Sequence, residues 1–426
     1  MADLALEEHR QSRIAQCAGE GAPDPDADWS LPGWIYTDPE FADLEIERVI
    51  RPSWQIVCHA SDIPNAGDWR TIDYCGESVV VVRGDDGAIR AFHNVCRHRA
   101  MRLVEGEAGC SRKFICAYHA WAYETDGRLS GVPMKRDYPA LRLEDNGLAP
   151  VALEVWHGFV FVRLEDAGFP SVAAMMAPYE AEVAPYRFAE MERISDVRLR
   201  PRSVNWKNVG DNYSDNLHIP VAHDGLTRIF GKSYEIEAQP WVDRMKGDLV
   251  DQPSAHFWER FYQAHLPRVP HLPEGAQRRW LYYKLWPNMA FDIYADQIDF
   301  MQWLPTSPTT CMLREMAFAL PDRYTPPGEE RRMKLVRYAN WRINRVVNQE
   351  DTWLIERVQQ GMHSASYGAG PIGRSEVCLR SFARKLRTLI PEARLHHAPG
   401  AGWSRNAALG VGEATPDISN GKEAPR

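Results

Sequence analysis

The sequence lacks both the long apolar run of a membrane protein and the basic charge of a nucleic-acid-binding protein. No uninterrupted apolar stretch approaches the roughly 18 residues that a transmembrane helix needs. With 50 basic and 58 acidic residues the net charge is −8, so no overall positive field would attract nucleic acid. The first ten residues also lack the basic and then apolar order of a secretory signal. We therefore expect a cytoplasmic protein without membrane or nucleic-acid partners.

Internal repeats and low-complexity blocks are absent as well, and the eight cysteines give no sign of a disulfide framework. A long chain without a secretory signal is expected to keep its thiols reduced. Charged residues make up 25% and hydrophobic residues 44%, which are ordinary values for globular proteins and exclude wholesale disorder. What the sequence has in abundance is aromatic side chains, with 15 Trp, 16 Tyr and 14 Phe. They fit a large core or an apolar substrate chamber.

The hydrophobic pattern predicts two structural regions behind a polar N-terminal arm at residues 1–33. Short apolar runs between turns, at 54–58, 78–83 and 89–92, predict a small all-β module from Trp54 to about Phe161. The second region mixes helical patterns at 170–190, near Trp206 and at 328–361 with strand-like alternation at 195–205, 280–294 and 299–304.

Two cysteines and two histidines in the β module form the first candidate metal site. Cys96, His98, Cys116 and His119 have the spacing C-x-H-x17-C-x2-H, and each pair follows a predicted strand. A tetrahedral zinc ion is one reading of such a set. Zinc fingers, however, usually place both cysteines first, whereas here each half carries one of each. This order favours a [2Fe–2S] cluster in which one iron takes both thiolates and the other both imidazoles.

The segment from Asn205 to His223 contains a second candidate site with the pattern D-x2-H-x4-H. Asp215 and His218 are three residues apart, so we expect them to share a helix face. His218 and His223 would diverge on one regular helix, but Pro220 breaks the helix and opens a second one. Two histidines from two helix ends then converge on one ion.

A carboxylate would complete a 2-His-1-carboxylate site, which binds Fe(II) and leaves positions open for O2. The candidate is Asp351, close to an apolar stripe on the long C-terminal helix that includes Leu335, Tyr338, Ile343, Val347, Leu354 and Val358. Glu350 is rotated away from that stripe. Surface carboxylates are common, so spacing alone does not select Asp351.

Both sites resemble the motifs of one family, the Rieske non-haem iron oxygenases, which hydroxylate rings or remove methyl groups. The cluster loops Asn94–Ala100 and Cys116–Trp121 look like the Rieske motif, and residues 205–223 and 349–361 are similar to the family's iron-binding blocks. Ala100 and Ala120 stand where the family commonly has glycine. Leu217 replaces a more frequent Tyr, and Asn216 is uncommon there. Respiratory Rieske proteins have a further Cys pair flanking both loops, which is missing here, since Cys110 lacks an evident partner.

The resemblance implies an α+β fold, with a small all-β Rieske [2Fe-2S] domain plus a helix-grip (START-like) antiparallel-sheet catalytic domain. The implied division is an N-terminal arm packing on the catalytic domain at 1–40, the Rieske domain at 41–165, the catalytic domain at 166–410 and a disordered tail at 411–426. Cys96, His98, Cys116 and His119 would bind the cluster, and His218, His223 and Asp351 one mononuclear Fe(II). Asp215 would be the catalytic acid that links His218 to a cluster histidine of a neighbouring subunit, His119.

The activity that the resemblance implies is that of a terminal oxygenase. It would use O2 and electrons from NAD(P)H, delivered through a flavin reductase, a ferredoxin or both. The family architecture implies a head-to-tail homotrimer, with or without a small beta subunit. Five basic residues surround the cluster motif and are either a docking face for an acidic electron donor or ordinary packing and subunit contacts: Arg97, Arg99, Arg102, Arg112 and Lys113.

The substrate is expected to be a small organic molecule, and the aromatic stretch from Trp280 to Tyr294 is a candidate lining of its chamber, with sheet packing accounting for at least half of these residues. Aromatic walls suit a flat ring by stacking and a quaternary ammonium group by cation–π contact. Because most of the family acts on aromatic compounds, ring hydroxylation or O-/N-demethylation in aromatic compound catabolism is the first expectation. A betaine or other quaternary ammonium monooxygenase is the alternative. Two readings from other classes are a Rieske electron-transfer protein without oxygen chemistry and a zinc-stabilised binding module.

Overall fold

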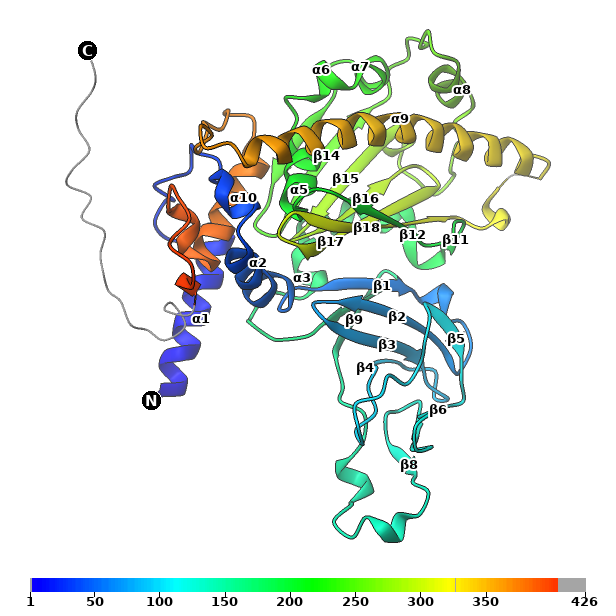
Figure 1. The fold of residues 1–426 in the computed structure, drawn as a ribbon. Helices are drawn as coiled ribbons and strands as arrows, with labels where there is room; N and C mark the ends of the chain where they lie inside the picture. Colours follow the sequence, from blue (N-terminus) through cyan, green and yellow to red (C-terminus); the bar gives the residue numbers. More distant parts are fainter. Residues whose placement is uncertain (1, 326, 405–426) are drawn as a thin grey trace.

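The computed structural model describes residues 2–325 and 327–404, and the tail expected at 411–426 lies outside them. A smaller all-β domain lies beneath a larger domain in which a long helix crosses a broad sheet (Figure 1). None of the described helices combines the length and the apolar character needed to cross a bilayer.

The smaller domain is built from three antiparallel sheets, ordered β4-β3-β2-β5, β1-β10-β9 and β6-β7-β8. The predicted strands at 54–58, 78–83 and 89–92 are present, and Val79 to Val82 on the central strand are fully buried. The strands are β1 (Gln55–His59), β2 (Asp68–Tyr74), β3 (Glu77–Arg83), β4 (Ile89–His93), β5 (Ala108–Cys110), β6 (Lys113–Ile115), β7 (Ala122–Glu124), β8 (Leu129–Gly131), β9 (Ala152–Trp156) and β10 (Phe159–Arg163).

The larger domain is an eight-stranded antiparallel sheet gripped by helices. Its strands follow the order β11-β18-β17-β16-β15-β14-β13, and β12 pairs with β18 at one edge. They are β11 (Glu192–Arg193), β12 (Arg198–Arg202), β13 (Glu235–Ala238), β14 (Val242–Asp248), β15 (Arg279–Leu285), β16 (Met289–Ile293), β17 (Gln297–Ser307) and β18 (Thr310–Ala319). The helices are α3 (Val172–Met176), α4 (Glu180–Val183), α5 (Trp206–Ser214), α6 (Ile219–Ala222), α7 (Asp224–Phe230), α8 (Phe257–His265), α9 (Glu330–Met362) and α10 (Val377–Leu389).

The N-terminal residues are more regular than the sequence suggests. Helix α1 (Ala2–Ala18) lies beside α10, where Cys17 is fully buried and Arg13 Nη2 donates to the Leu389 carbonyl at 2.7 Å. A second helix, α2 (Pro39–Glu45), follows. The Gly-Ala-Pro-Asp-Pro-Asp segment suggested an irregular arm, but a helix precedes it. That helix has few apolar residues and packs against α10.

Glu45 of α2 explains why residues 205–207 begin a helix where they do. The Lys207 ammonium lies 2.7 Å from Glu45 Oε1, and Trp206 Nε1 donates to Glu45 Oε2 at 3.0 Å, with all three side chains buried. The Asn205 side chain caps α5 by accepting from Lys207 N at 2.9 Å. These contacts fix the helix whose far end carries Asp215.

The long helix α9 was predicted correctly in extent, but its buried face was partly wrong. Leu335 and Tyr338 are 51% and 42% exposed, whereas Met333, Val336, Asn340 and Ile343 are buried. Two overlapping apolar stripes run along this sequence. The stripe that is buried is the one that contains the polar Asn340. Four-residue steps along the buried stripe lead from Ile343 through Val347 to Asp351, which places this carboxylate on the inner face.

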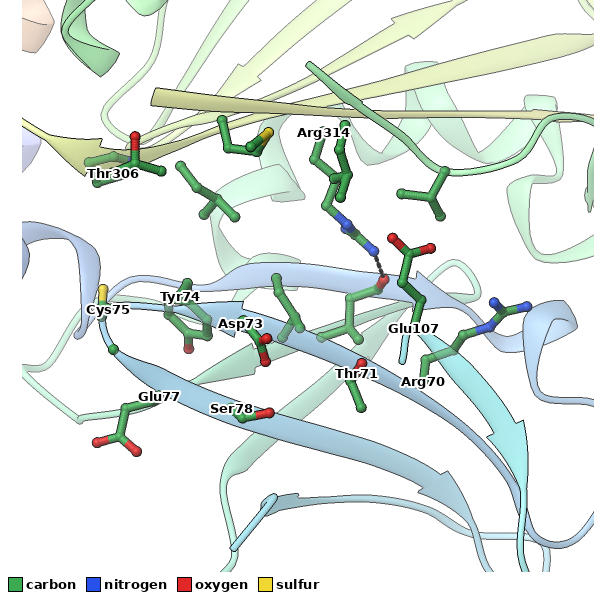
Figure 2. Close-up of a pocket in the computed structure, with 18 of the residues that line it drawn as sticks. Arg70, Thr71, Asp73, Tyr74, Cys75, Glu77, Ser78, Glu107, Thr306 and Arg314 are labelled. Atoms are coloured by element: carbon green, nitrogen blue, oxygen red, sulfur yellow. Dashed lines mark hydrogen bonds between the residues drawn. The ribbon is translucent and has the colours of Figure 1, made fainter. Parts of the chain in front are cut away.

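A polar network joins the two domains. Arg314 on β18 donates from Nη1 to the Ile56 carbonyl at 3.1 Å and from Nη2 to the Val57 carbonyl at 2.5 Å. Gln55 exchanges hydrogen bonds with Asn288 at 3.0 and 3.2 Å. Beside this network is a cavity of about 1010 Å³, and Figure 2 shows Arg314 reaching across it from the larger domain.

Candidate active site

The two loops after β4 and β6 are built alike. In the first, Cys96 N donates to Met101 O at 2.7 Å and Ala100 N to Cys96 O at 3.1 Å; in the second, Cys116 N donates to Trp121 O and Ala120 N to Cys116 O, both at 2.9 Å. Ala100 and Ala120 turn each loop with φ of +57° and +56°. This left-handed conformation favours glycine, which explains why glycine is common at both positions in the family that the sequence resembles.

The two histidines predicted as cluster ligands face each other, and the two cysteines lie in one buried cluster of the same domain. Cys96 and Cys116 are each only 2% exposed. The centres of the His98 and His119 imidazole rings lie 4.5 Å apart. The Nδ1 atoms of both histidines are buried and have no hydrogen-bond partner among the described residues. Two thiols and two orphaned ring nitrogens are the donor set that a [2Fe–2S] cluster with mixed ligation needs.

A single zinc ion fits this set poorly. Tetrahedral ligation would bring all four ligand atoms together around one ion. Within the described parts of the chain, one group of three His, Cys, Asp or Glu residues has all its ligand atoms within 4.8 Å of one another. That group is His218, His223 and Asp351, and it does not include the loop residues. The loop residues are therefore spread more widely than one ion requires.

Neighbouring groups that the sequence analysis did not identify hold the loop residues in place. The Arg97 amide donates to the Tyr123 hydroxyl at 3.0 Å, and the same hydroxyl lies within hydrogen-bond distance of Cys96 Sγ at 3.3 Å. The Trp121 ring stacks on His98 at 4.8 Å. Of the five basic residues near the cluster motif, for which a docking face and ordinary packing were both open, Arg102 pairs with Asp73 at 2.8 Å and Lys113 with Glu124 at 2.6 Å.

The second site brings together the predicted two histidines and one carboxylate. His218 Nε2 lies 3.1 Å from His223 Nε2, and Asp351 Oδ1 lies 3.6 Å from the first and 2.9 Å from the second. The loop before α6, the end of α6 and the middle of α9 supply these three atoms. Two imidazole nitrogens and one carboxylate oxygen on one side of an ion are the donor set of the Fe(II) facial triad.

Asp215 contacts His218 as expected, but the two do not share a helix face. Helix α5 ends at Ser214, and Asp215 adopts extended backbone angles, φ −83° and ψ 131°. Its Oδ1 accepts from Leu217 N at 2.7 Å, while Oδ2 lies 3.0 Å from His218 Nδ1. This local turn takes the place of the helix that residue spacing suggested. Pro220 lies in the first turn of α6, as predicted.

Two further residues hold the triad. Glu350 Oε2 lies 2.7 Å from His223 Nδ1, and Asn212 Nδ2 donates to Asp351 Oδ1 at 2.7 Å. Burial would lower the pKa of His218, but hydrogen bonds to Asp215 and Asp351 raise it to about 9. Burial would likewise raise the pKa of Asp351, yet the two histidines and Asn212 hold it at about 2. The carboxylate is therefore ionised, as a metal ligand must be.

A cavity of about 430 Å³ lies between α9 and the sheet, and its lining includes Asn348, one turn before Asp351, but none of the triad residues themselves. Two carboxylates line it, Asp292 on β16 and Asp299 on β17, and they are direct cross-strand neighbours. Burial raises the pKa of each to about 7. Tyr213 donates to Asp292 Oδ1 at 2.5 Å, and it follows Asn212, the residue bound to Asp351, so one helix end contacts both the chamber and the triad.

Core and sheet packing account for most of the aromatic stretch from Trp280 to Tyr294, and Asp292 is its contribution to the lining of this cavity. Trp280 packs against Tyr262 and Tyr294 in the core, and Tyr283 bonds Glu182 on the other side. Tyr282 of this stretch is the cross-strand neighbour of Asp292. Its ring centre lies 6.5 Å from that of Tyr213 and 6.4 Å from that of Tyr234. The cavity walls come mainly from residues outside the stretch: Phe300, Met301, Met316, Tyr338 and Trp341.

Comparison with known proteins agrees with this two-site arrangement. Residues 53–144 match the family model of the Rieske [2Fe-2S] domain, and residues 188–392 match that of the ring hydroxylating alpha subunit (catalytic domain). The carnitine monooxygenase oxygenase subunit of Escherichia coli (strain K12) is 29% identical over 82% of this chain and 88% of its own length.

Two further proteins extend the comparison. The glycine betaine monooxygenase oxygenase subunit of Chromohalobacter salexigens is 35% identical over 55% of this chain and 51% of its own length. The crystal structure of naphthalene 1,2-dioxygenase from Rhodococcus sp. bound to indole superposes with a TM-score of 0.72 at 21% identity, covering 90% of this chain and 98% of that one. The fold is thus shared with proteins whose names specify different substrates.

Proposed function

Since the chain is a Rieske non-haem iron oxygenase, matching the family in both domains, we propose that it oxidises a small quaternary ammonium compound at a carbon bound to nitrogen. The family assignment makes the chain a terminal oxygenase with one [2Fe–2S] cluster and one mononuclear iron, fed with electrons by a reductase. The substrate, the residue roles, the oligomer and the cytoplasmic location are our proposal.

Each predicted ligand has a role in this proposal. Cys96, Cys116, His98 and His119 hold the cluster, and His218, His223 and Asp351 hold the iron. When bound, the cluster supplies electrons one at a time and the iron activates O2. Asp215 orients His218 through the 3.0 Å contact with its Nδ1 and lies on the path between the two metal sites.

The observation that carries the substrate proposal is the carboxylate pair in the chamber. Asp292 and Asp299 face each other across two strands, and Asp351 adds to the charge acting on Asp292. An uncharged ring would bury these groups without compensation, which is costly. A quaternary ammonium group would instead neutralise them and meet the ring faces of Phe300, Tyr338 and Trp341, which line the same cavity. The names of the two similar bacterial subunits, which act on carnitine and glycine betaine, support this choice.

The chemistry can be written for a trimethylammonium substrate. One oxygen atom of O2 enters a methyl C–H bond, while two electrons and two protons reduce the other atom to water. The resulting N-hydroxymethyl group breaks its C–N bond to give formaldehyde, a proton and the dimethylamine product. In this scheme the chamber places the nitrogen end of the substrate near Asp292, which accepts from Tyr213 of α5, the helix whose Asn212 donates to Asp351.

The test is a product screen with iron-replete, reduced protein under 18O2. Glycine betaine, carnitine and choline are compared with benzoate and methoxybenzoate, and the Asp351→Ala variant serves as the control that lacks the iron-binding carboxylate. We expect an oxidised product from a quaternary ammonium compound and none from the variant. Turnover of the aromatic compounds alone would contradict the proposal.

An aromatic carboxylic acid is the second candidate substrate. The aromatic walls of the chamber and the arginines at its edge, Arg198 and Arg345, favour such a molecule. It would bring no positive charge of its own to the Asp292–Asp299 pair, which is why we place it second.

We propose that the enzyme is a head-to-tail homotrimer in the cytoplasm, supplied by a ferredoxin or flavin reductase. Apolar side chains lie exposed beside both metal sites. Around Asp215 and the triad they are Leu217, Val221, Trp353 and Val358, and beside the cluster loops they are Met101, Ile115, Tyr118 and Met134. Val221 is 83% exposed and Met134 77%, unusual values for such residues in a free surface. Docking one set on the other would place a cluster histidine beside Asp215 of the next subunit.

A further inference from the structure

The chamber carries opposite charges at its two ends. Asp292 and Asp299 occupy the part formed by β16 and β17, toward the middle of the sheet. At the sheet edge, Arg198, Arg200 and Arg202 alternate along β12, so all three lie on one face, and Arg198 is paired across the ladder with Glu315 of β18. On the same ladder Glu315 is opposite Met301, which lines the cavity. The arginine face is therefore the one directed toward the chamber and α9.

These arginines differ in whether their charge is already neutralised. Arg200 Nε lies 3.0 Å from Glu315, and Arg337 Nε lies 2.8 Å from Asp296. Arg198 and Arg345 have no carboxylate within salt-bridge distance among the described residues, although both line the cavity. Two guanidinium groups at the chamber edge are thus left for a ligand.

Trp341 of α9 holds both groups in place. The Arg198 guanidinium lies 6.0 Å from the centre of the Trp341 ring, and that of Arg345 lies 5.3 Å from it. A second hollow shares Arg200, Trp341 and Arg345 with the chamber and adds Arg202 to its lining. Stacked guanidinium groups keep their N–H donors free at the edge, where they can bind a carboxylate in bidentate fashion.

We infer that Arg198 and Arg345, positioned by Trp341, bind the carboxylate end of a zwitterionic substrate whose ammonium end lies at Asp292 and Asp299. The inference rests on the proposed function for the nitrogen end of the substrate, and adds the residues that select its other end. Opposite charges at the two ends of one cavity fix the direction in which the molecule enters. The carbon next to nitrogen is then directed toward the iron triad, and the carboxylate stays at the edge.

Two ligand pairs test the inference by isothermal titration with the holoenzyme. The first pair is glycine betaine and choline, and the second is benzoate and benzyl alcohol; one member of each pair carries a carboxylate and the other does not. In Arg198→Gln and Arg345→Gln we expect about tenfold weaker binding of the carboxylate member, the loss of roughly one charge-assisted contact. Choline binding is expected to stay the same or tighten, because a repelling cation has been removed.

The matched control is Arg342→Gln, an exposed arginine of α9 that lies over Trp258 instead. It should leave both members of each pair unchanged. Equal weakening of choline and glycine betaine binding in the Arg198 and Arg345 variants would indicate a structural role and overturn the inference. Unchanged binding of the carboxylate ligands in these variants would also overturn it. So would wild-type protein that binds neither ligand pair. If only benzoate binds, and its affinity falls in the two variants, the carboxylate site stands while the quaternary ammonium proposal fails.

Discussion

Two alanines in left-handed backbone conformation are the clearest local strain at the cluster loops. Ala100 and Ala120 have φ of +57° and +56°, a region that costs an L-residue about 1 kcal/mol more than glycine. We expect Ala100→Gly and Ala120→Gly each to raise the free energy of unfolding of the Rieske domain by about 1 kcal/mol. Denaturant unfolding of the holoprotein, followed by the visible absorption of the cluster, measures it.

The control for this prediction is Ala108→Gly on β5, where the backbone is extended and exposed. Glycine there should lower the free energy of unfolding by about 0.5 kcal/mol, because it only adds freedom to the unfolded chain. Stability changes of the same sign at all three positions would contradict the strain argument.

Glu350 is the residue that the sequence analysis set aside and the structure places beside the metal triad. Its Oε2 lies 2.7 Å from His223 Nδ1, which keeps the proton on that nitrogen and leaves Nε2 free for the metal. We expect Glu350→Gln to weaken iron binding about tenfold, as is usual when such a supporting carboxylate is lost. Iron retained against a graded chelator measures the effect, with Glu356→Gln on the same helix as the control. Wild-type retention in Glu350→Gln would assign Glu350 to packing alone.

The chamber carboxylates predict how cation binding depends on pH. Because burial raises the pKa of Asp292 and of Asp299 to about 7, both are mostly neutral at pH 6 and mostly ionised at pH 8. The dissociation constant for choline should therefore fall about tenfold across this range. Neighbouring groups modulate the two pKa values: Tyr213 and Asp351 act on Asp292, Gln297, Arg198 and Asp296 on Asp299, and Glu315 on both. Asp292→Asn should flatten the profile, and an equally steep profile in that variant would contradict the assignment.

Among the elements, strand β18 joins the two domains through one side chain. Arg314 is 7% exposed, and burial lowers its pKa to about 10, so it remains charged at neutral pH. Arg314→Leu would leave the carbonyls of Ile56 and Val57 without donors, and we expect a loss of about 2–4 kcal/mol in the free energy of unfolding. Urea unfolding measures it, and the exposed Arg331→Leu should change stability by no more than about 0.5 kcal/mol. A change that small in Arg314→Leu would show that the domain contact does not depend on this residue.

Periodicity predicted the elements better than it predicted their faces. Short β-runs between turns and the extent of α9 follow from local pattern, and both were predicted from the sequence. The face of α9 was not, because two apolar stripes overlap and only the opposing sheet selects between them. The contact of Asp215 with His218 was predicted for the wrong reason: a three-residue spacing suggested a helix, whereas α5 ends at Ser214 and a turn makes the contact.

At the scale of the whole molecule, the sequence predicted residues that the structure brings together at both proposed metal sites, but not their surroundings. Motif spacing singles out the cysteines and histidines because few other functions use such a set. Glu350, Asn212 and Asp292 become functional candidates only when distant segments meet, since polar residues of these types are common in any sequence. The charge gradient of the chamber likewise arises from three strands and one helix that no local pattern links.

The last prediction concerns transfer between subunits. Cys96→Ser removes a proposed cluster ligand and Asp351→Ala a proposed iron ligand, so each variant alone should be inactive. Co-expressed in equal amounts, they should recover about a quarter of the wild-type activity per chain, because half of the subunits carry a working cluster and half of their neighbours a working iron site. The control pair Cys96→Ser with His98→Ala lacks a complete cluster site in every chain and should stay inactive. No recovery in the first pair would mean that electrons pass within one chain, and the exposed apolar residues around Asp215 would then need another partner.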